Sequence, residues 1–131
     1  VEKEFVLKIW AKNCGAVYAQ YIIVFFNIPV LILNEHYHEP DDYSFIGQDG
    51  TIYHRFSMNN AYRANVDSPT DYRPVLPGLS RSWEILLDNH FDELNIPKLN
   101  ITYSIHADNA PPLTGSILVQ DIEVIDLGRR W

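Results

Sequence analysis

The sequence predicts an antiparallel β-sandwich of about seven to eight strands, formed by a single domain that spans residues 1–131. Several short segments alternate apolar and polar residues with a period of two, which is typical of half-buried strands. Turn-forming residues separate these segments, and no long segment has a helical period. A hydrophobic fraction of 47% and an aromatic fraction of 13% fit a domain with its own core.

Residues 13–29 form the segment on which the expected sandwich depends. Asn13 and Gly15 predict a turn, and Pro29 ends the strand that follows because proline has no N–H for a ladder. Alternate positions put one apolar set on one face, namely Ile22, Val24, Phe26 and Ile28. The opposite face carries Ile23 and Phe25. A strand that is apolar on both faces is covered twice or offers one face to a partner.

Ile23 and Phe25 are therefore candidate interface residues. They would pack on a parent domain or on a second copy of the chain, which would give a homodimer. The alternative is that the loops of the sandwich itself cover them.

The other strands are expected from the same alternation, at residues 5–11, 51–57, 79–87, 99–107 and 115–127. The last of these has an ambiguous register, which a bulge near Gln120 and Asp121 would reconcile. Residues 30–33 continue as a short strand or a turn, and residues 88–94 form one helical turn. Irregular connections are expected at residues 34–50, 58–74 and 108–112, the last a stiff turn.

Charge and composition exclude several classes of function. The net charge is −7 and the basic residues are scattered, so direct nucleic-acid binding by this domain is not expected. No apolar run approaches the roughly 18 residues of a membrane span. The single Cys14 forms no internal disulfide, and we expect a cytoplasmic location. Because the chain begins at Val1 rather than Met, we expect it to be excised from the C-terminal part of a longer protein, or processed.

Three separated stretches carry a family resemblance. The pattern Asn13-x-Gly15-x-x-x-Ala19, followed by aliphatic residues and Ile28-Pro29, resembles immunoglobulin-like bacterial modules of the CARDB type. Residues 75–87 (VLPGLSRSWEILL) resemble the proline-glycine loop and the following strand of the same sandwiches. Together with residues 101–117 (ITYSIHADNAPPLTGSI) they are similar to the C-terminal region of bacterial proteins with an N-terminal Schlafen-like, AlbA-type domain.

That resemblance implies an immunoglobulin-like fold and an accessory role. The parent proteins are described as ATP-binding or DNA-binding transcriptional regulators, and their nucleotide or DNA contacts would lie upstream of these residues. The implied partner is then the upstream domain of the same parent chain. No catalytic residue carries over, and the segment at residues 34–50 has no counterpart in the family.

Residues 35–42 (EHYHEPDD) are the one cluster that suggests a ligand site. His36 and His38 are two residues apart, so on an extended segment both rings point to the same side. Glu39 is the first choice of oxygen ligand, and Glu35, Asp41 and Asp42 add others. Imidazole with carboxylate suits Zn²⁺ or a similar divalent ion. The alternative is a solvated acidic loop that happens to hold two histidines.

We expect no cofactor other than that metal ion, and we do not expect enzyme activity. The serines lack the glycines of a nucleophile elbow, and the glycines are spread singly rather than as a phosphate loop. We therefore predict a non-catalytic module for interdomain or protein–protein contact. The alternatives are the metal-binding domain and a secreted carbohydrate-binding module. The latter would stack sugars on the aromatic side chains of Trp10, Tyr37, Tyr43, Tyr53, Tyr62 and Tyr72.

Overall fold

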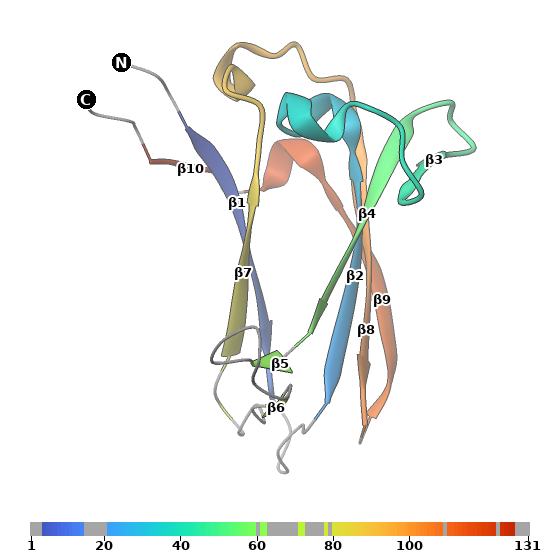
Figure 1. Cartoon of the computed structure of the whole chain (residues 1–131), viewed down its shortest axis with the longest axis vertical. Helices are drawn as coiled ribbons and strands as arrows, with labels where there is room; N and C mark the ends of the chain where they lie inside the picture. Colours follow the sequence, from blue (N-terminus) through green and yellow to red (C-terminus); the bar gives the residue numbers. More distant parts are fainter. Residues whose placement is uncertain are drawn as a thin grey trace.

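The structure is a computed structural model that describes residues 4–14, 21–59, 61–62, 71–72, 78, 80–108, 110–122 and 124–127. These residues form an antiparallel, immunoglobulin-like β-sandwich, which confirms the predicted fold class (Figure 1). The strands are β1 (Phe5–Lys12), β2 (Ile22–Pro29), β3 (Ser44–Ile46), β4 (Ile52–Asn59), β5 (Ala61–Tyr62), β6 (Asp71–Tyr72), β7 (Ser80–Leu86), β8 (Asn100–Ala107), β9 (Ala110–Leu118) and β10 (Val124–Asp126). Single 3₁₀ turns lie between them, at η1 (Val30–Ile32), η2 (Glu35–Tyr37), η3 (Phe91–Glu93) and η4 (Val119–Asp121). No helix in these ranges has the length and apolar character to cross a membrane.

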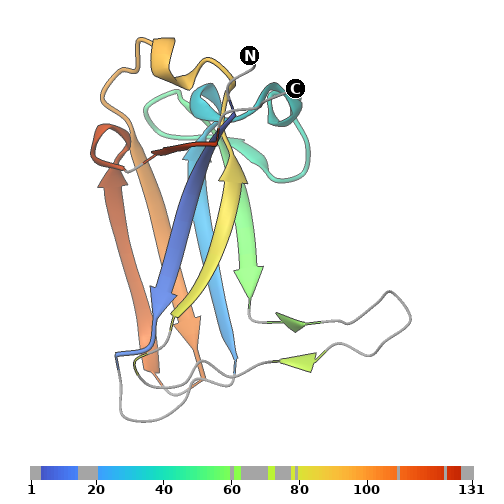
Figure 2. The ribbon, with the colours of Figure 1, turned by 90° about the vertical axis from the view of Figure 1, so that its left-hand side faces the viewer.

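The strands lie in two facing layers. One sheet has the order β10–β1–β7 and the other β3–β4–β2–β8–β9, while β5 and β6 pair as a separate ribbon at one end (Figure 2). In immunoglobulin terms β1 and β7 hold the places of strands B and E, and β4–β2–β8–β9 hold those of C′–C–F–G. The place of strand A, beside B, is taken by the C-terminal strand β10. The position of β10 therefore determines how much of the β1 edge is paired.

The core lies between the two sheets. On β2 the predicted inward set is sealed, with Ile22, Val24, Phe26 and Ile28 exposed by 6% or less. Strand β1 contributes Phe5 and Leu7 from the facing sheet, and the alternation predicted for residues 79–87 places Ile85 and Leu87 inside. Leu33 bridges to Leu87 at the closed end of the sandwich, and both are fully buried.

The other face of β2 is not sealed. Ile23 is 41% exposed, and Phe25 is half-buried with its ring edge-on to that of His106. Asn27 on the same face donates a hydrogen bond to Oγ1 of Thr102 and accepts one from Arg55. Apolar and polar side chains thus alternate across this face, and the prediction that Ile23 and Phe25 make an interface stays a prediction.

The prediction of one last strand over residues 115–127 is wrong. The chain leaves the five-stranded sheet at the end of β9, passes through η4, and enters the other sheet as β10. Val119 in η4 is buried, and its N–H donates to the carbonyl of Leu99 at 2.8 Å. Residues 115–118 therefore end one strand and Val124–Asp126 form another in the other sheet, so no bulge near Gln120 and Asp121 is needed to reconcile the register.

Two expected connections are also shorter than predicted. Strand β9 begins at Ala110, so Pro111 and Pro112 belong to an edge strand rather than to a turn. Edge strands accept proline because an outward N–H has no ladder partner to lose. Within residues 34–50, η2 and the short edge strand β3 replace part of the expected loop. Much of the connection predicted at residues 58–74 lies outside the described residues.

Candidate functional site: an apolar groove beside strand β1

Strand β1 is paired unequally on its two sides. On one side β7 pairs with it from Val6 to Lys12. On the other side the register with β10 covers only Phe5 to Leu7. In the part of the chain that the structure describes, no strand continues beside β1 beyond that point. The half of β1 that ends at Lys12 therefore has an open edge.

The backbone groups on that open edge can be assigned from their neighbours. The carbonyl of Phe5 accepts from Leu87 N on the β7 side at 2.9 Å, and the carbonyl of Glu4 accepts from Leu127 N on the β10 side at 2.8 Å. Successive residues of a strand direct their N–H and C=O groups to alternate sides. Trp10 and Lys12 therefore direct their backbone groups to the open side, where an added strand would meet them.

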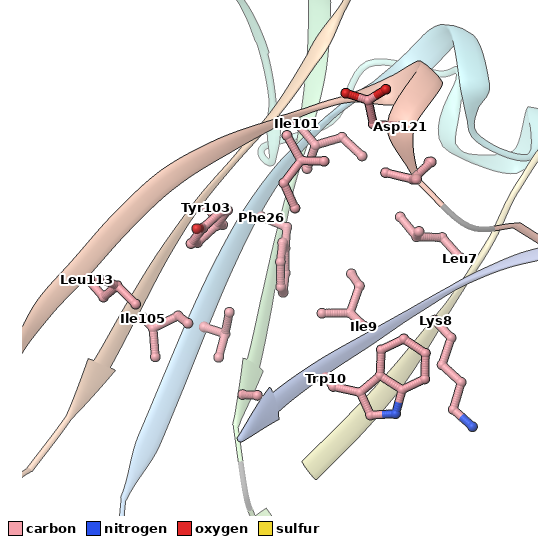
Figure 3. Close-up of a pocket in the computed structure, with 14 residues that line it drawn as sticks. Leu7, Lys8, Ile9, Trp10, Phe26, Ile101, Tyr103, Ile105, Leu113 and Asp121 are labelled. Atoms are coloured by element: carbon pink, nitrogen blue, oxygen red, sulfur yellow. The ribbon is translucent and has the colours of Figure 1, made fainter. Parts of the chain in front are cut away.

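An apolar groove of about 380 Å³ lies along this edge, between the two sheets. Its far wall is the inner face of β9, where Leu113 is 60% and Ile117 is 42% exposed. Figure 3 shows Ile9 of β1 directed into the space between the walls, with Ile105 and Leu113 opposite. Aliphatic side chains on the inner face of a sandwich are normally buried. Here a strand that paired with the whole of β1 would cover them.

The polar groups of the groove lie at its rim. Nζ of Lys8 lies 5.6 Å from the centroid of the Trp10 ring, which is itself 55% exposed. Asp121, in η4, lies at the end of the groove nearest β10 (Figure 3). The interior of the groove is thus apolar, and its charged groups lie at the rim.

Gly115 shapes one wall of the groove. It pairs with Tyr103 across β8 and β9, and a Cβ at this position would lie 2.6 Å from Cζ of the Tyr103 ring. The ring therefore rests on the bare backbone of the glycine. Sequence reasoning did not find this pair, although a glycine within an alternating strand often marks such a close approach.

The metal site predicted at His36, His38 and Glu39 is not assembled. The segment is not extended: His36 is in η2 and His38 caps it, so the expectation that both rings share one side rested on the wrong backbone. Nε2 of His38 donates to the carbonyl of Leu33 at 2.8 Å. Among the described residues no group of three or more His, Cys, Asp or Glu could hold a metal ion. Metal binding there stays a prediction without a cluster to support it.

The same segment holds an acidic turn beside a buried histidine. Oδ1 of Asp41 accepts from the backbone N–H of Tyr43 at 2.8 Å, and Oδ2 lies 3.5 Å from Nε2 of His54. His54 is only 7% exposed, and its Nδ1 has no partner among the described residues. The Tyr43 hydrogen bond holds the pKa of Asp41 below its usual value. The backbone N–H of Thr51 does the same for the pKa of Asp49.

These lowered pKa values predict a pH dependence of stability. Because each folded-state pKa lies below the unfolded one, the unfolded chain binds more protons in acid. The contribution is therefore fully present above about pH 4 and lost as pH falls through the folded values. Asp41→Asn and Asp49→Asn keep an acceptor oxygen but do not titrate. We expect the double variant to flatten the acid side of the curve of urea midpoint against pH.

The control for this measurement is Asp42→Asn, an exposed neighbour in the same segment. It should leave the pH dependence of the urea midpoint as it is in the unaltered chain. A double variant with the same acid loss as the unaltered chain would contradict the assignment.

The aromatic residues of the carbohydrate hypothesis do not form one row. Trp10 lies at the groove, whereas Tyr37 packs on His54 and Phe56, with ring centroids 5.2 and 5.3 Å away. Tyr53 stacks on Phe45 at an interplanar angle of 20°. The side chains of residues 62 and 72 lie outside what the structure describes. Carbohydrate binding stays a prediction.

Fold and groove together define a class: an immunoglobulin-like sandwich whose A position is filled over only part of its length. Comparisons of the chain with protein-family models, with curated proteins and with solved structures find no match.

Proposed function

We propose that this chain is a non-catalytic module that contacts another protein domain through the groove beside β1. The observation that supports this is the coincidence of exposed Leu113 and Ile117 with the open backbone edge at Trp10 and Lys12. An open edge over an apolar floor invites pairing with other chains, which is why proteins normally cover such edges. A dedicated partner provides that cover.

The finer form of the proposal places the chain in a bacterial regulator with an upstream Schlafen-like, AlbA-type domain and a cytoplasmic location. The support for it is the resemblance of residues 75–87 and 101–117 to the C-terminal region of such proteins. In that setting the upstream domain is the first candidate partner, and Ile23 with Phe25 is a predicted second contact.

Oxidative footprinting tests the contact without knowledge of the partner. Hydroxyl radicals are generated in cells that produce the full-length protein and, separately, in a solution of the purified chain. We expect oxidation of Trp10, 55% exposed in the free chain, to be several-fold slower in cells. Tyr43, which is 64% exposed and lies elsewhere, is the internal reference. Equal rates for Trp10 relative to Tyr43 in both settings would remove the proposal.

A pair of matched variants localises the protection. Leu113→Asp puts a charge into the groove and should restore the in-cell oxidation of Trp10. Ile52→Asp introduces the same charge at a comparably exposed isoleucine on β4, away from the groove, and should leave the protection intact.

A further inference from the structure

We infer that the groove takes an extended, acidic segment of another protein, which adds as a strand beside β1 and places aliphatic side chains between the sheets. This inference rests on the proposed function and names the chemistry of the partner. It is a case of recognition by strand addition, in which main-chain hydrogen bonds supply affinity and alternate side chains supply specificity.

The main-chain part follows from the open edge. Trp10 and Lys12 direct an N–H and a C=O each toward the groove side, in the direction in which β10 pairs with the first half of β1. An incoming strand would thus continue the place of strand A past the point where β10 stops. No backbone rearrangement of β1 is required, because its other side stays paired to β7 along the whole length.

The side-chain part follows from the period of two. Residues of the added strand that share the inward face of Ile9 and Ala11 would enter the groove, and the intervening residues would face solvent. The inward positions meet Ile105 and Leu113, so they favour aliphatic side chains. Leu113, now 60% exposed, would then become buried.

The outward positions are selected by charge. Lys12 pairs across the sheet with Ser80, whereas Lys8 pairs with Glu84, and Asp121 lies at the closed end of the groove. Glu84 therefore offsets part of the charge of Lys8, whereas Ser80 leaves the charge of Lys12, at the open end, in full. Opposite charges on neighbouring strands stabilise a sheet and like charges destabilise it. Carboxylates at the outward positions of the added strand meet this requirement.

The same rule disfavours a second copy of this chain as the occupant. Two β1 edges that pair antiparallel about Trp10 bring Lys8 of each copy opposite Lys12 of the other. Two pairs of like charges would then face each other at the interface.

The test uses synthetic peptides and fluorescence anisotropy. The probe is fluorescein-GEVEVEVG, the charge-reversed probe is fluorescein-GKVKVKVG, and the polar probe is fluorescein-GESESESG. At about 0.15 M salt, long-range fields are screened within about 8 Å. We expect the acidic probe to bind at least about tenfold more tightly than the other two. The net charge of −7 by itself favours the basic probe, so the two expectations have opposite signs.

Two pairs of variants tie the binding to the groove. Lys12→Glu should weaken the acidic probe about tenfold, while Lys98→Glu, the same charge change at an exposed loop residue, should not. Trp10→Pro removes the N–H on the open side and none on the β7 side, so it should abolish binding. Trp10→Ala keeps that N–H and should retain binding. Thermal melts verify that each variant is folded. If Trp10→Pro does not fold, Lys12→Glu still tests the inference.

The inference is overturned if the acidic probe does not bind at about 1 mM, if the basic probe binds as tightly, or if Lys12→Glu leaves binding unchanged. Concentration-dependent dimers in sedimentation that Trp10→Pro dissolves would assign the groove to a second copy instead. If the acidic probe does not bind but oxidation of Trp10 is slow in cells, the proposed function stands and the groove takes a different occupant. Rapid oxidation of Trp10 in cells would remove both.

Discussion

Replacement of Leu33 by alanine is expected to lower the free energy of unfolding by about 3 kcal/mol, within the range of 2–5 kcal/mol for buried leucines. Leu33 is fully buried and bridges to Leu87, so it ties the end of η1 to the strand of the facing sheet. Truncation removes apolar contacts from both layers and leaves a cavity between them. Urea unfolding followed by tryptophan fluorescence measures the change.

Leu31 provides the matched control, because it is the same residue type two positions earlier and is 43% exposed. Leu31→Ala removes the same atoms from a site that is already partly in water, and it should cost less than about 1 kcal/mol. Similar losses for the two variants would mean that the end of the sandwich at η1 is not packed as described.

Gly115→Ala is expected to destabilise the chain by about 1–3 kcal/mol, the usual cost of overpacking. The added Cβ would lie 2.6 Å from Cζ of Tyr103, so the ring must leave its place over the glycine. In most strands the same exchange is favourable, because alanine loses less backbone entropy than glycine on folding. A destabilising effect of Gly115→Ala would therefore indicate the contact with Tyr103, because backbone entropy alone predicts stabilisation.

A double-mutant cycle separates the two contributions. In a Tyr103→Ala background the ring is gone, and Gly115→Ala should then be neutral or stabilising, with a coupling of about 1 kcal/mol or more. Gly50 offers a contrast: its φ is +82° and no side chain lies near its Cβ position, so the cost of Gly50→Ala should not depend on Tyr103. No coupling between positions 103 and 115 would contradict the close approach.

Local patterns predicted the strands well where one strand serves one sheet. The alternation at residues 5–11, 79–87 and 99–107 places the inward side chains correctly, because burial on one face of a pleated strand imposes a period of two. On β2 the sequence left open whether both faces are covered. The structure shows Val24 almost wholly buried and its neighbour Ile23 41% exposed.

Prediction failed where a segment depends on contacts far along the chain. Residues 115–127 belong to two strands, and the pattern cannot show that Val124–Asp126 joins the other sheet. A local error has a different cause: the orientation of His36 and His38 was expected from an extended backbone, whereas the segment closes into a 3₁₀ turn stabilised by the Asn34 side chain. The groove left no signal in the sequence, since it arises because, among the described residues, no strand pairs with the second half of β1 on that side.

What the sequence by itself determined is the fold class and the inward face of β1, β7 and β8, because both follow from short-range alternation and from where turns can form. Only the tertiary structure decided that β10 fills the first half of the place beside β1 and leaves the second half open. The length of a ladder depends on where the chain leaves one sheet for another. Here that point is η4, where burial of Val119 and its bond to Leu99 turn the chain across the sandwich, so that β10 begins opposite Leu7 and runs back toward Phe5.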